Sequence, residues 1–242
     1  MVKQLPLRIR RTEDKEKKGP HGAWRQEFCR KYLGLLVNTR QNSFDSMLES
    51  LSAEGKSISC RAACTYCCYH YVAVSLAQGI LIVDYLYKRK ALLKQFVDNY
   101  ESWRRDGESI SHDIDRIRIH ALSSSIPMHQ VLNDTRPLSN RYLETNIPCP
   151  FLVDEKCSIY EVRPMACSGH HSVSPPDWCA PASKQKPAIQ HSMPDDEAFI
   201  EMIQLTGSQL TLYELTLPTM VYRLLTEGSS AMMAEIAGLN LA

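Results

Sequence analysis

Apolar side chains recur at helical spacing along the first quarter of the chain, but only after a polar start. Residues 1–20 hold seven lysines or arginines against three acids up to Lys18 and little to bury, so we predict a flexible, basic N-terminus. Over residues 21–55 the spacing predicts a helix or a pair of helices, which Gly55 would end. The apolar positions are Trp24, Phe28, Tyr32, Leu35, Leu36, Phe44, Met47, Leu48 and Leu51.

The middle of the chain predicts further helices, introduced by a short extended run at Tyr69–Val74. Ser75 is placed to cap a long helix that runs to about Arg105, and Gly107 predicts a break after it. Its expected buried side holds Ile80, Val83, Tyr87, Phe96, Tyr100 and Trp103. Two more helices are predicted, one around Ile114, Ile117 and Leu122 that ends near Pro127, and a short one at Leu138–Glu144 after Pro137.

The region from Ile147 to Pro187 is irregular and rich in proline, and helical patterns return after it. Asp195 and Asp196 behind Pro194, with Ser192 nearby, predict a helix start with acids at its positive end. Terminal helices interrupted at Pro218 are predicted from Phe199, Ile200, Ile203, Leu210, Leu215, Val221, Leu224 and Leu225. The expected fold class is mainly α, a single helical domain with an irregular, loop-rich lobe.

Composition and charge limit the classes of partner. Among 242 residues, 44% are apolar, which is enough for a core, and 28 basic residues against 27 acids leave a net charge of +1. Such a chain has no overall attraction for nucleic acid or an anionic membrane. The polar start does not resemble a secretory signal, and the longest uncharged stretch, Tyr71–Val83, is too short to span a bilayer. We therefore expect a cytoplasmic protein.

Nine cysteines are the most informative part of the composition. Disulfides belong to oxidising compartments and mostly to small secreted domains, and an odd number cannot pair completely within the chain. In a reducing compartment, cysteines clustered at short spacings favour metal ligation. Cys29 stands apart on a predicted helix and is expected to be a small core residue.

Four cysteines lie within nine residues, at Cys60, Cys64, Cys67 and Cys68. On a helix all four thiols would share one face, and in a loop the same spacing would wrap them around a centre. Either geometry brings the sulfurs together. Thiolates are soft donors that select zinc, copper(I) or iron–sulfur clusters.

Four more cysteines lie in the proline-rich lobe, at Cys149, Cys157, Cys167 and Cys179. Their spacing is longer than in ordinary zinc ribbons and is by itself only moderately specific. The lobe has few apolar runs, so metal ligation would supply the stability that its small core lacks.

The order of these motifs resembles a known family. C-x₃-C-x₂-C-C, then C-P-F-L, C-x-I-Y, R-P-x-x-C and a final cysteine resemble the YkgJ-like cysteine-cluster proteins, described as zinc- or iron-chelating domains. The resemblance extends from Cys60 to Cys179. It implies that the chelating residues are Cys60, Cys64, Cys67, Cys68, Cys149, Cys157, Cys167 and Cys179. It implies no reaction, although some members of the family resemble flagellin lysine methylases.

Alternatives remain for the first cysteine group. Cys60, Cys64 and Cys67 also fit the three-cysteine pattern of radical S-adenosylmethionine enzymes, with Tyr66 as the aromatic before the third cysteine. Such enzymes resemble partial α/β barrels, and the repeated strand–helix alternation that a barrel needs is absent downstream of Cys68.

Other residues near the cysteines are candidate ligands or charge partners. His170 and His171 could complete a coordination sphere, but we expect solvated loop histidines because eight cysteines already fill two four-ligand sites. Arg163 is expected either to bind loop carbonyls or to balance thiolate charge. Adjacent Cys67 and Cys68 would not easily bind one metal, which favours two neighbouring centres.

Three functions follow from these patterns. The first is a metal-binding protein that holds zinc or an iron–sulfur cluster, with the identity undecided. The second is an iron–sulfur enzyme, radical or protein-modifying. The third is an interaction module with a protein partner. We divide the chain into the N-terminus (1–20), a helical segment (21–55), a cysteine-cluster metal-binding domain (56–187) and a C-terminal helical segment (188–242).

Overall fold

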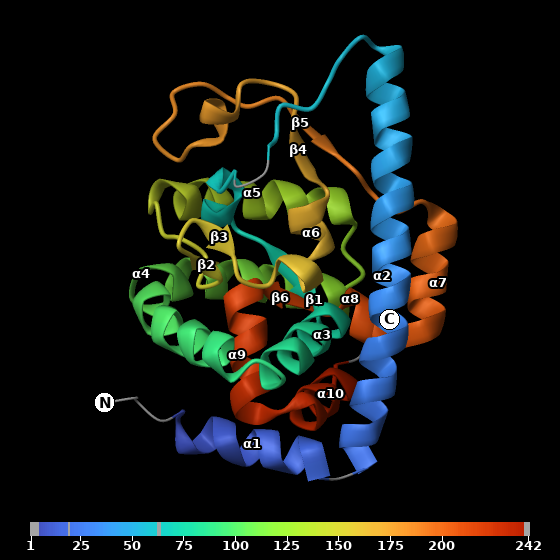
Figure 1. The fold of residues 1–242 in the computed structure, drawn as a ribbon, viewed down its shortest axis with the longest axis vertical. Coiled ribbons are helices and arrows are strands. Elements are labelled where there is room, and N and C mark those ends of the chain that lie inside the picture. Colours follow the sequence, from blue (N-terminus) through green and yellow to red (C-terminus); the bar gives the residue numbers. More distant parts are fainter. Residues whose placement is uncertain (1–4, 19, 62–63, 240–242) are drawn as a thin grey trace.

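The computed structural model describes residues 5–18, 20–61 and 64–239. Within these ranges ten α-helices and three small sheets confirm the mainly α fold class (Figure 1). None of the described helices combines the length and apolar character that a membrane crossing needs. The helices are α1 (Leu7–Lys18), α2 (Pro20–Ala53), α3 (Leu76–Tyr87), α4 (Lys90–Ser123), α5 (Met128–Glu144), α6 (Met165–Ser168), α7 (Asp196–Thr206), α8 (Ser208–Leu212), α9 (Leu217–Glu227) and α10 (Ser229–Ala237).

The segment predicted as a helix or a helix pair is one helix, α2, which runs along one side of the molecule with α7 beside it (Figure 1). Pro20 lies at its first position, where the missing amide costs no helical hydrogen bond. Gly55 follows its end with a positive φ of 66°, and the amide of Lys56 reaches back to the carbonyl of Leu51 at 2.8 Å. The predicted glycine stop is therefore confirmed.

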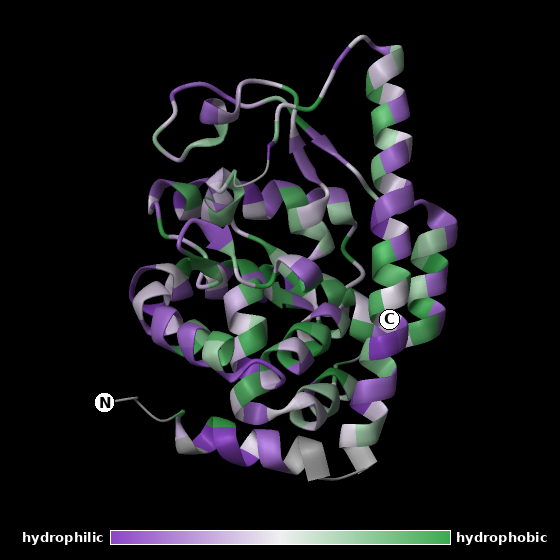
Figure 2. Ribbon diagram, viewed as in Figure 1, coloured by the Kyte–Doolittle hydropathy of each residue, from purple (hydrophilic) through white to green (hydrophobic). Residues whose placement is uncertain are grey.

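Residues 7–18 form α1, in place of the flexible terminus predicted from charge. The helix is hydrophilic over most of its length, yet Ile9 is only 1% exposed (Figure 2). The helix packs against α2 and α9, and Arg8 Nε donates to the carbonyl of Thr226 at 3.0 Å. The buried Ile9 and the contacts with residues distant in sequence anchor α1. Neither feature produces a periodic pattern of apolar residues in the sequence. Residues 1–4 and 19 of the predicted segment lie outside the described residues.

The long helix predicted to end near Arg105 is divided into α3 and α4, which meet at Lys88 and Arg89. The break predicted at Gly107 does not occur, because this glycine lies inside α4 beneath an indole ring. A Cβ atom there would lie 2.9 Å from Nε1 of Trp103. Gly107 therefore provides room for a buried tryptophan and does not end the helix.

Two prolines also differ from their predicted roles. Pro137 lies inside α5, so this helix begins ten residues earlier than predicted. Pro218 lies in the first turn of α9, directly after a strand that contains Leu215, and does not interrupt a helix. The first turn of a helix tolerates proline because its amides have no helical acceptor. The start predicted at Asp195 is confirmed, since its carboxylate accepts from the amide of Ala198 at 2.8 Å.

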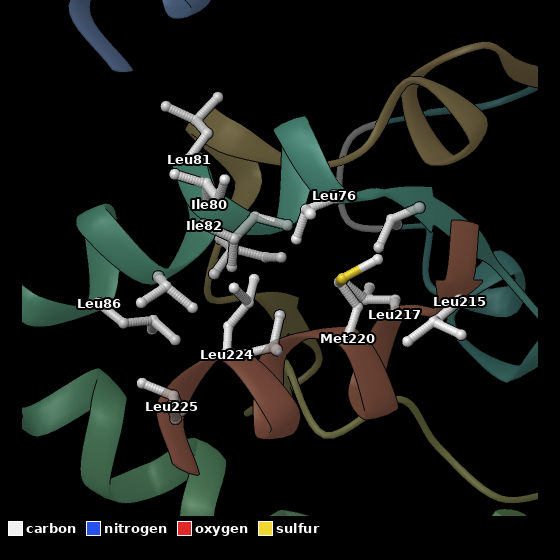
Figure 3. Packing of buried hydrophobic residues seen from close by; sticks show 14 of the residues in the cluster. Leu76, Ile80, Leu81, Ile82, Leu86, Leu215, Leu217, Met220, Leu224 and Leu225 are labelled. Atoms are coloured by element: carbon white, nitrogen blue, oxygen red, sulfur yellow. The ribbon is translucent and has the colours of Figure 1, made fainter. Parts of the chain in front are cut away.

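The centre of the core is the contact between α3 and α9 (Figure 3). Gly79 permits their close approach, because a Cβ atom there would lie 2.5 Å from Cγ of Met220. The side chains drawn in this contact include Leu76, Ile80, Ile82, Leu86, Leu215, Leu217, Met220, Leu224 and Leu225. The helical body therefore holds most of the core, and Phe151, Ile159 and Val162 of the proline-rich lobe also belong to it. The cysteine segments lie on one side of the helical body (Figure 1).

The described strands form only two-stranded antiparallel sheets. They pair β1 (Ala73–Ser75) with β6 (Glu214–Thr216), β2 (Leu152–Val153) with β3 (Lys156–Cys157), and β4 (His170–Ser172) with β5 (Ile189–His191). This arrangement differs from the partial α/β barrel that radical S-adenosylmethionine enzymes resemble. Ser75 ends β1 and caps α3 as predicted, with its hydroxyl accepting from the amide of Gln78 at 3.3 Å.

A buried carboxylate connects β6 to the helical body. Asp115 of α4 accepts hydrogen bonds from the Thr216 amide at 2.7 Å and the Thr216 hydroxyl at 2.8 Å. The Tyr71 hydroxyl also donates to it, at 3.3 Å. Burial raises the pKa of Asp115 from 3.8 to about 6, against the lowering effect of these donors. The folded protein therefore binds a proton at this carboxyl more tightly than the unfolded chain does.

We expect replacement of Asp115 by asparagine to flatten the pH dependence of stability between pH 4 and 6. With a raised pKa, the folded state binds more protons than the unfolded state in this window, so the stabilisation is complete below about pH 4 and is lost as the pH rises through 6. The shift corresponds to at most about 3 kcal/mol. Urea unfolding of both proteins from pH 4 to 7 measures it, and equal slopes would contradict this account.

Candidate metal centre

The first cysteine group lies in a loop that ends in a 3-10 helix, Tyr66–Tyr69, and not on one face of an α-helix. The amide of Cys68 donates to the carbonyl of Thr65 at 2.9 Å, and the amide of Cys64 to that of Arg61 at 3.1 Å. Residues 62 and 63, between Cys60 and Cys64, lie outside the described residues. Of the two predicted geometries, helix or loop, the loop therefore holds for Cys64, Cys67 and Cys68.

A backbone hydrogen bond joins the two cysteine groups directly. The amide of Cys149 donates to the carbonyl of Cys68 at 2.7 Å. Two residues that are 81 positions apart in the chain are thereby fixed side by side, with no contribution from their side chains. The sequence grouped these cysteines by spacing alone, and the structure brings the second group onto the first.

The hairpin β2–β3 positions Cys157. Its two-residue turn, Asp154–Glu155, has positive φ at both positions (47° and 57°), as turns that match the twist of antiparallel strands require. Cys157 pairs across the hairpin with Leu152, which lies three residues after Cys149. The short helix α6 then carries Cys167, whose amide donates to the carbonyl of Pro164 at 3.0 Å.

Backbone amides are directed at several of the sulfurs. The amide of Phe151 hydrogen-bonds to the thiol of Cys149, that of Ile159 to Cys157, and that of Tyr66 to Cys64. In each case the donor lies two residues beyond the cysteine. Each bond favours the thiolate form, which is the form that binds a metal.

Cys60 and Cys179 lie at the other end of the site, near β4. The amide of Ser172 donates to Sγ of Cys60 at 3.2 Å, and the amide of Ser59 donates to the carbonyl of Ser172 at 2.8 Å. The Ser172 hydroxyl hydrogen-bonds to the thiol of Cys179. A single strand residue therefore bonds to both cysteines.

Mutual electrostatic effects divide the thiols into two sets. Burial raises the pKa of Cys167 well above its usual value, and the thiolates of Cys149 and Cys157 raise it further. The pKa of Cys68 is raised by its hydrogen bond with Cys67, by burial, and by the charges of Cys149 and Cys157. We call Cys68, Cys149, Cys157 and Cys167 the inner set.

The remaining thiols affect one another in the same way. Burial raises the pKa of Cys179, and the thiolates of Cys60 and Cys64 raise it further. Burial likewise raises the pKa of Cys64, and the charge of Cys60 adds to the effect. We call Cys60, Cys64 and Cys179 the outer set. Cys67 acts on members of both sets and therefore lies between them.

Cys67 differs from these thiols in the direction of its pKa shift. Its hydrogen bond with Cys68 and then the charge of Arg163 lower its pKa to about 7, against the opposing effect of burial. By contrast, burial raises the pKa of Cys149 to about 12. Without a cation a buried thiol such as Cys149 stays protonated at neutral pH, so metal uptake there must release a proton and weaken as the pH falls.

Arg163 acts on the thiolates, and within the described ranges its guanidinium donates to no loop carbonyl. Its charge lowers the pKa of Cys67 and of Cys157, and its guanidinium lies 4.2 Å from the ring centroid of Tyr160. The carbonyls of the loop are bound by Arg40 of α2, which donates to Glu161 at 3.3 Å and to Arg163 itself. The charge-balancing role considered for Arg163 therefore has structural support.

Six of the eight clustered cysteines line a cavity of about 430 Å³. Its wall is mostly apolar and includes Cys64, Cys67, Cys68, Cys149, Cys157, Cys167, His70, Tyr142, Phe151, Arg163 and Leu217. No three His, Cys, Asp or Glu side chains of the described residues are already arranged to hold a metal ion. Ligation therefore needs the side chains to move toward the centre.

The donor set fits the soft metals that thiolates select. All nine cysteines are free thiols, and eight of them are the predicted ligands. They line or adjoin one apolar cavity, amides face several sulfurs, and a cation stands beside them. Zinc or iron bound here would supply positive charge that offsets the thiolates in a site with little water.

Comparison with known proteins supports this assignment. A family model described as "Putative zinc- or iron-chelating domain", and named CxxCxxCC for its motif, matches residues 59–192. The match covers more than half of the chain. The chain belongs to this family. The resemblance stated from the motifs is thereby confirmed, although Cys60 and Cys64 stand one residue further apart than the family name indicates. No curated protein and no solved structure matches the chain.

The histidines of this zinc- or iron-chelating domain differ from the prediction. His170 and His171 lie in strand β4 and are not solvated loop residues. His171 is 8% exposed and its ring lies 5.1 Å from that of Phe44. Burial, then the charges of His70 and other histidines, lowers the pKa of His170 to about 4. His70 lines the cavity itself but is not among the predicted ligands. It lies two residues after the paired cysteines.

Cys29 is not part of the centre. It lies on α2 and is 3% exposed, with its thiol 3.8 Å from the carbonyl of Ile80 on α3. The core role predicted for it is confirmed.

Proposed function

We propose that the protein chelates zinc or iron, the latter alone or as an iron–sulfur cluster, through thiolates of all eight clustered cysteines in two adjoining centres. The inner set forms one centre and the outer set the other, and Cys67 is the thiolate between them. A reducing cytoplasm would keep these thiols available.

One observation carries the proposal: the amide of Cys149 bonds to the carbonyl of Cys68 beside a thiol-lined cavity. This bond makes two distant segments present their cysteines to the same space. Random clustering of small buried residues would not also direct amides at the sulfurs, place an arginine beside them and leave an apolar cavity between them.

Metal analysis of the full chain, purified without oxygen, tests the proposal. We expect near-stoichiometric zinc, or iron with or without inorganic sulfide, and proton release on metal uptake by the metal-free protein. Zinc in a colourless protein would identify structural ion sites, whereas sulfide and a brown colour would identify a cluster. A protein that retains and takes up neither metal would refute chelation.

The size of the cavity favours a second candidate, an iron–sulfur enzyme. A volume of about 430 Å³ lies within the range of small-molecule sites, and a single ion surrounded by four thiolates would fill little of it. The aromatic rings of Tyr142 and Phe151 in its wall would suit an apolar substrate. Zinc as the native metal would exclude this candidate.

A further inference from the structure

The outer set contains three thiols, whereas a closed tetrahedral centre needs four ligands. Two side chains near it could supply the fourth, Cys67 and His70. The thiol of Cys67 hydrogen-bonds to Cys68, and its charge acts on Cys149, Cys157 and Cys167 as well as on the outer set. Its closest bonded partner therefore belongs to the inner set, and the fourth position of the outer set is left open.

His70 follows the 3-10 helix that carries Cys67 and Cys68, and its own amide donates to the carbonyl of Cys67 at 3.2 Å. This turn packs against another 3-10 helix, Pro176–Cys179. The imidazole donates a hydrogen bond to the backbone carbonyl of Cys179 and therefore lies beside it. The side chain is thus placed next to a member of the outer set.

The free end of the imidazole is the decisive feature. Nε2 of His70 is buried and has no hydrogen-bond partner among the described residues. The same side chain lines the cavity together with Cys64, another member of the outer set. A buried nitrogen without a partner costs free energy in a folded protein, so such an atom calls for an explanation. A metal ion accepts the lone pair of a neutral imidazole and would remove this cost.

A row of imidazole rings holds His70 in place. Its ring lies 5.6 Å from that of His170, which in turn lies 5.2 Å from that of His191. The last two residues pair across β4 and β5. Fixed orientation of this kind, with a backbone partner on one side and a free nitrogen on the other, is typical of metal-binding histidines.

We propose that His70 is the fourth ligand of the outer centre, which then has three cysteines and one histidine. This inference rests on the proposed chelation and adds a ligand that the cysteine pattern does not contain. Cys67 then belongs with Cys68 in the inner centre and is not a ligand of the outer one. Three-cysteine, one-histidine sets are an established ligand combination for zinc.

Titration of the metal-free, reduced full chain with Co²⁺ tests the ligand. Absorption by bound Co²⁺ reports both the number of sites and the replacement of a nitrogen ligand by sulfur. We expect His70→Asn to lower the Co²⁺ affinity of one of the two sites at least about tenfold. Loss of a residue that only supports a metal ligand already costs about this much, so loss of a ligand should cost no less. His70→Cys should retain both sites, with stronger sulfur-to-metal absorption.

His191→Asn is the matched control, because His191 belongs to the same row of imidazole rings but is exposed, at the end away from His70. It should bind Co²⁺ like the wild type. Unchanged binding and spectrum in His70→Asn, with loss of a site in Cys67→Ser, would overturn the inference and leave chelation intact. Failure of the wild type to bind Co²⁺, Zn²⁺ and iron would instead refute the proposed function.

Discussion

Replacement of Cys149 by serine is expected to abolish metal binding at the inner centre and to destabilise the protein by at least about 4 kcal/mol. The amide of Cys149 bonds to the carbonyl of Cys68, and the substitution leaves this backbone contact intact. It removes only the sulfur, and a serine hydroxyl is a hard, protonated donor that soft metals disfavour. Elemental analysis of the purified variant, with thermal unfolding beside the wild type, measures both effects.

Cys29→Ala provides the control for this experiment. Cys29 is buried in the core, with its thiol against the carbonyl of Ile80, and it lies outside both sets. We expect it to retain the full metal content and to lose only about 1 kcal/mol from packing. Equal metal content in Cys149→Ser and the wild type would contradict ligation by Cys149.

The sequence predicted the helical body where local signals agree with the tertiary structure. The start at Ser75, the stop at Gly55 and the start at Asp195 are confirmed because each depends on a cap within a few residues. Predictions failed where a distant partner decides. Gly107 serves the indole of Trp103, and α1 forms on the surfaces of α2 and α9.

The candidate site shows the same limit. Cysteine order and spacing were sufficient to name the family, but spacing could not divide eight thiols between two centres. That division depends on folding of the lobe onto the 3-10 helix, and on the bond between Cys149 and Cys68 in particular. His70 escaped notice for a related reason. One histidine near a motif has no significance until the structure shows its buried, unpartnered nitrogen beside the cavity.

Removal of the metal is expected to unfold the cysteine lobe while the helical body persists. The lobe, residues 147–191, contains strands of two or three residues and 3-10 turns, and isolated two-stranded sheets are marginally stable in water. Its cavity wall is mostly thiols and apolar groups, which would collapse or hydrate without a central ion. The contact between α3 and α9 buries its own apolar surface and includes none of the eight cysteines.

Hydrogen exchange with mass spectrometry, before and after treatment with a strong chelator under reducing conditions, measures this difference. Amides of residues 147–191, and of the turn at 66–69 that bonds to them, should lose protection by orders of magnitude, because structural thiolate sites contribute roughly 10 kcal/mol or more to folding. Amides of α3 and α9 should change little. Protection of the lobe should return with Zn²⁺ or Fe²⁺ but not with Mg²⁺, which prefers oxygen ligands. Unaltered exchange in the lobe of the metal-free protein would mean that packing alone holds it, and the eight cysteines would then need another explanation.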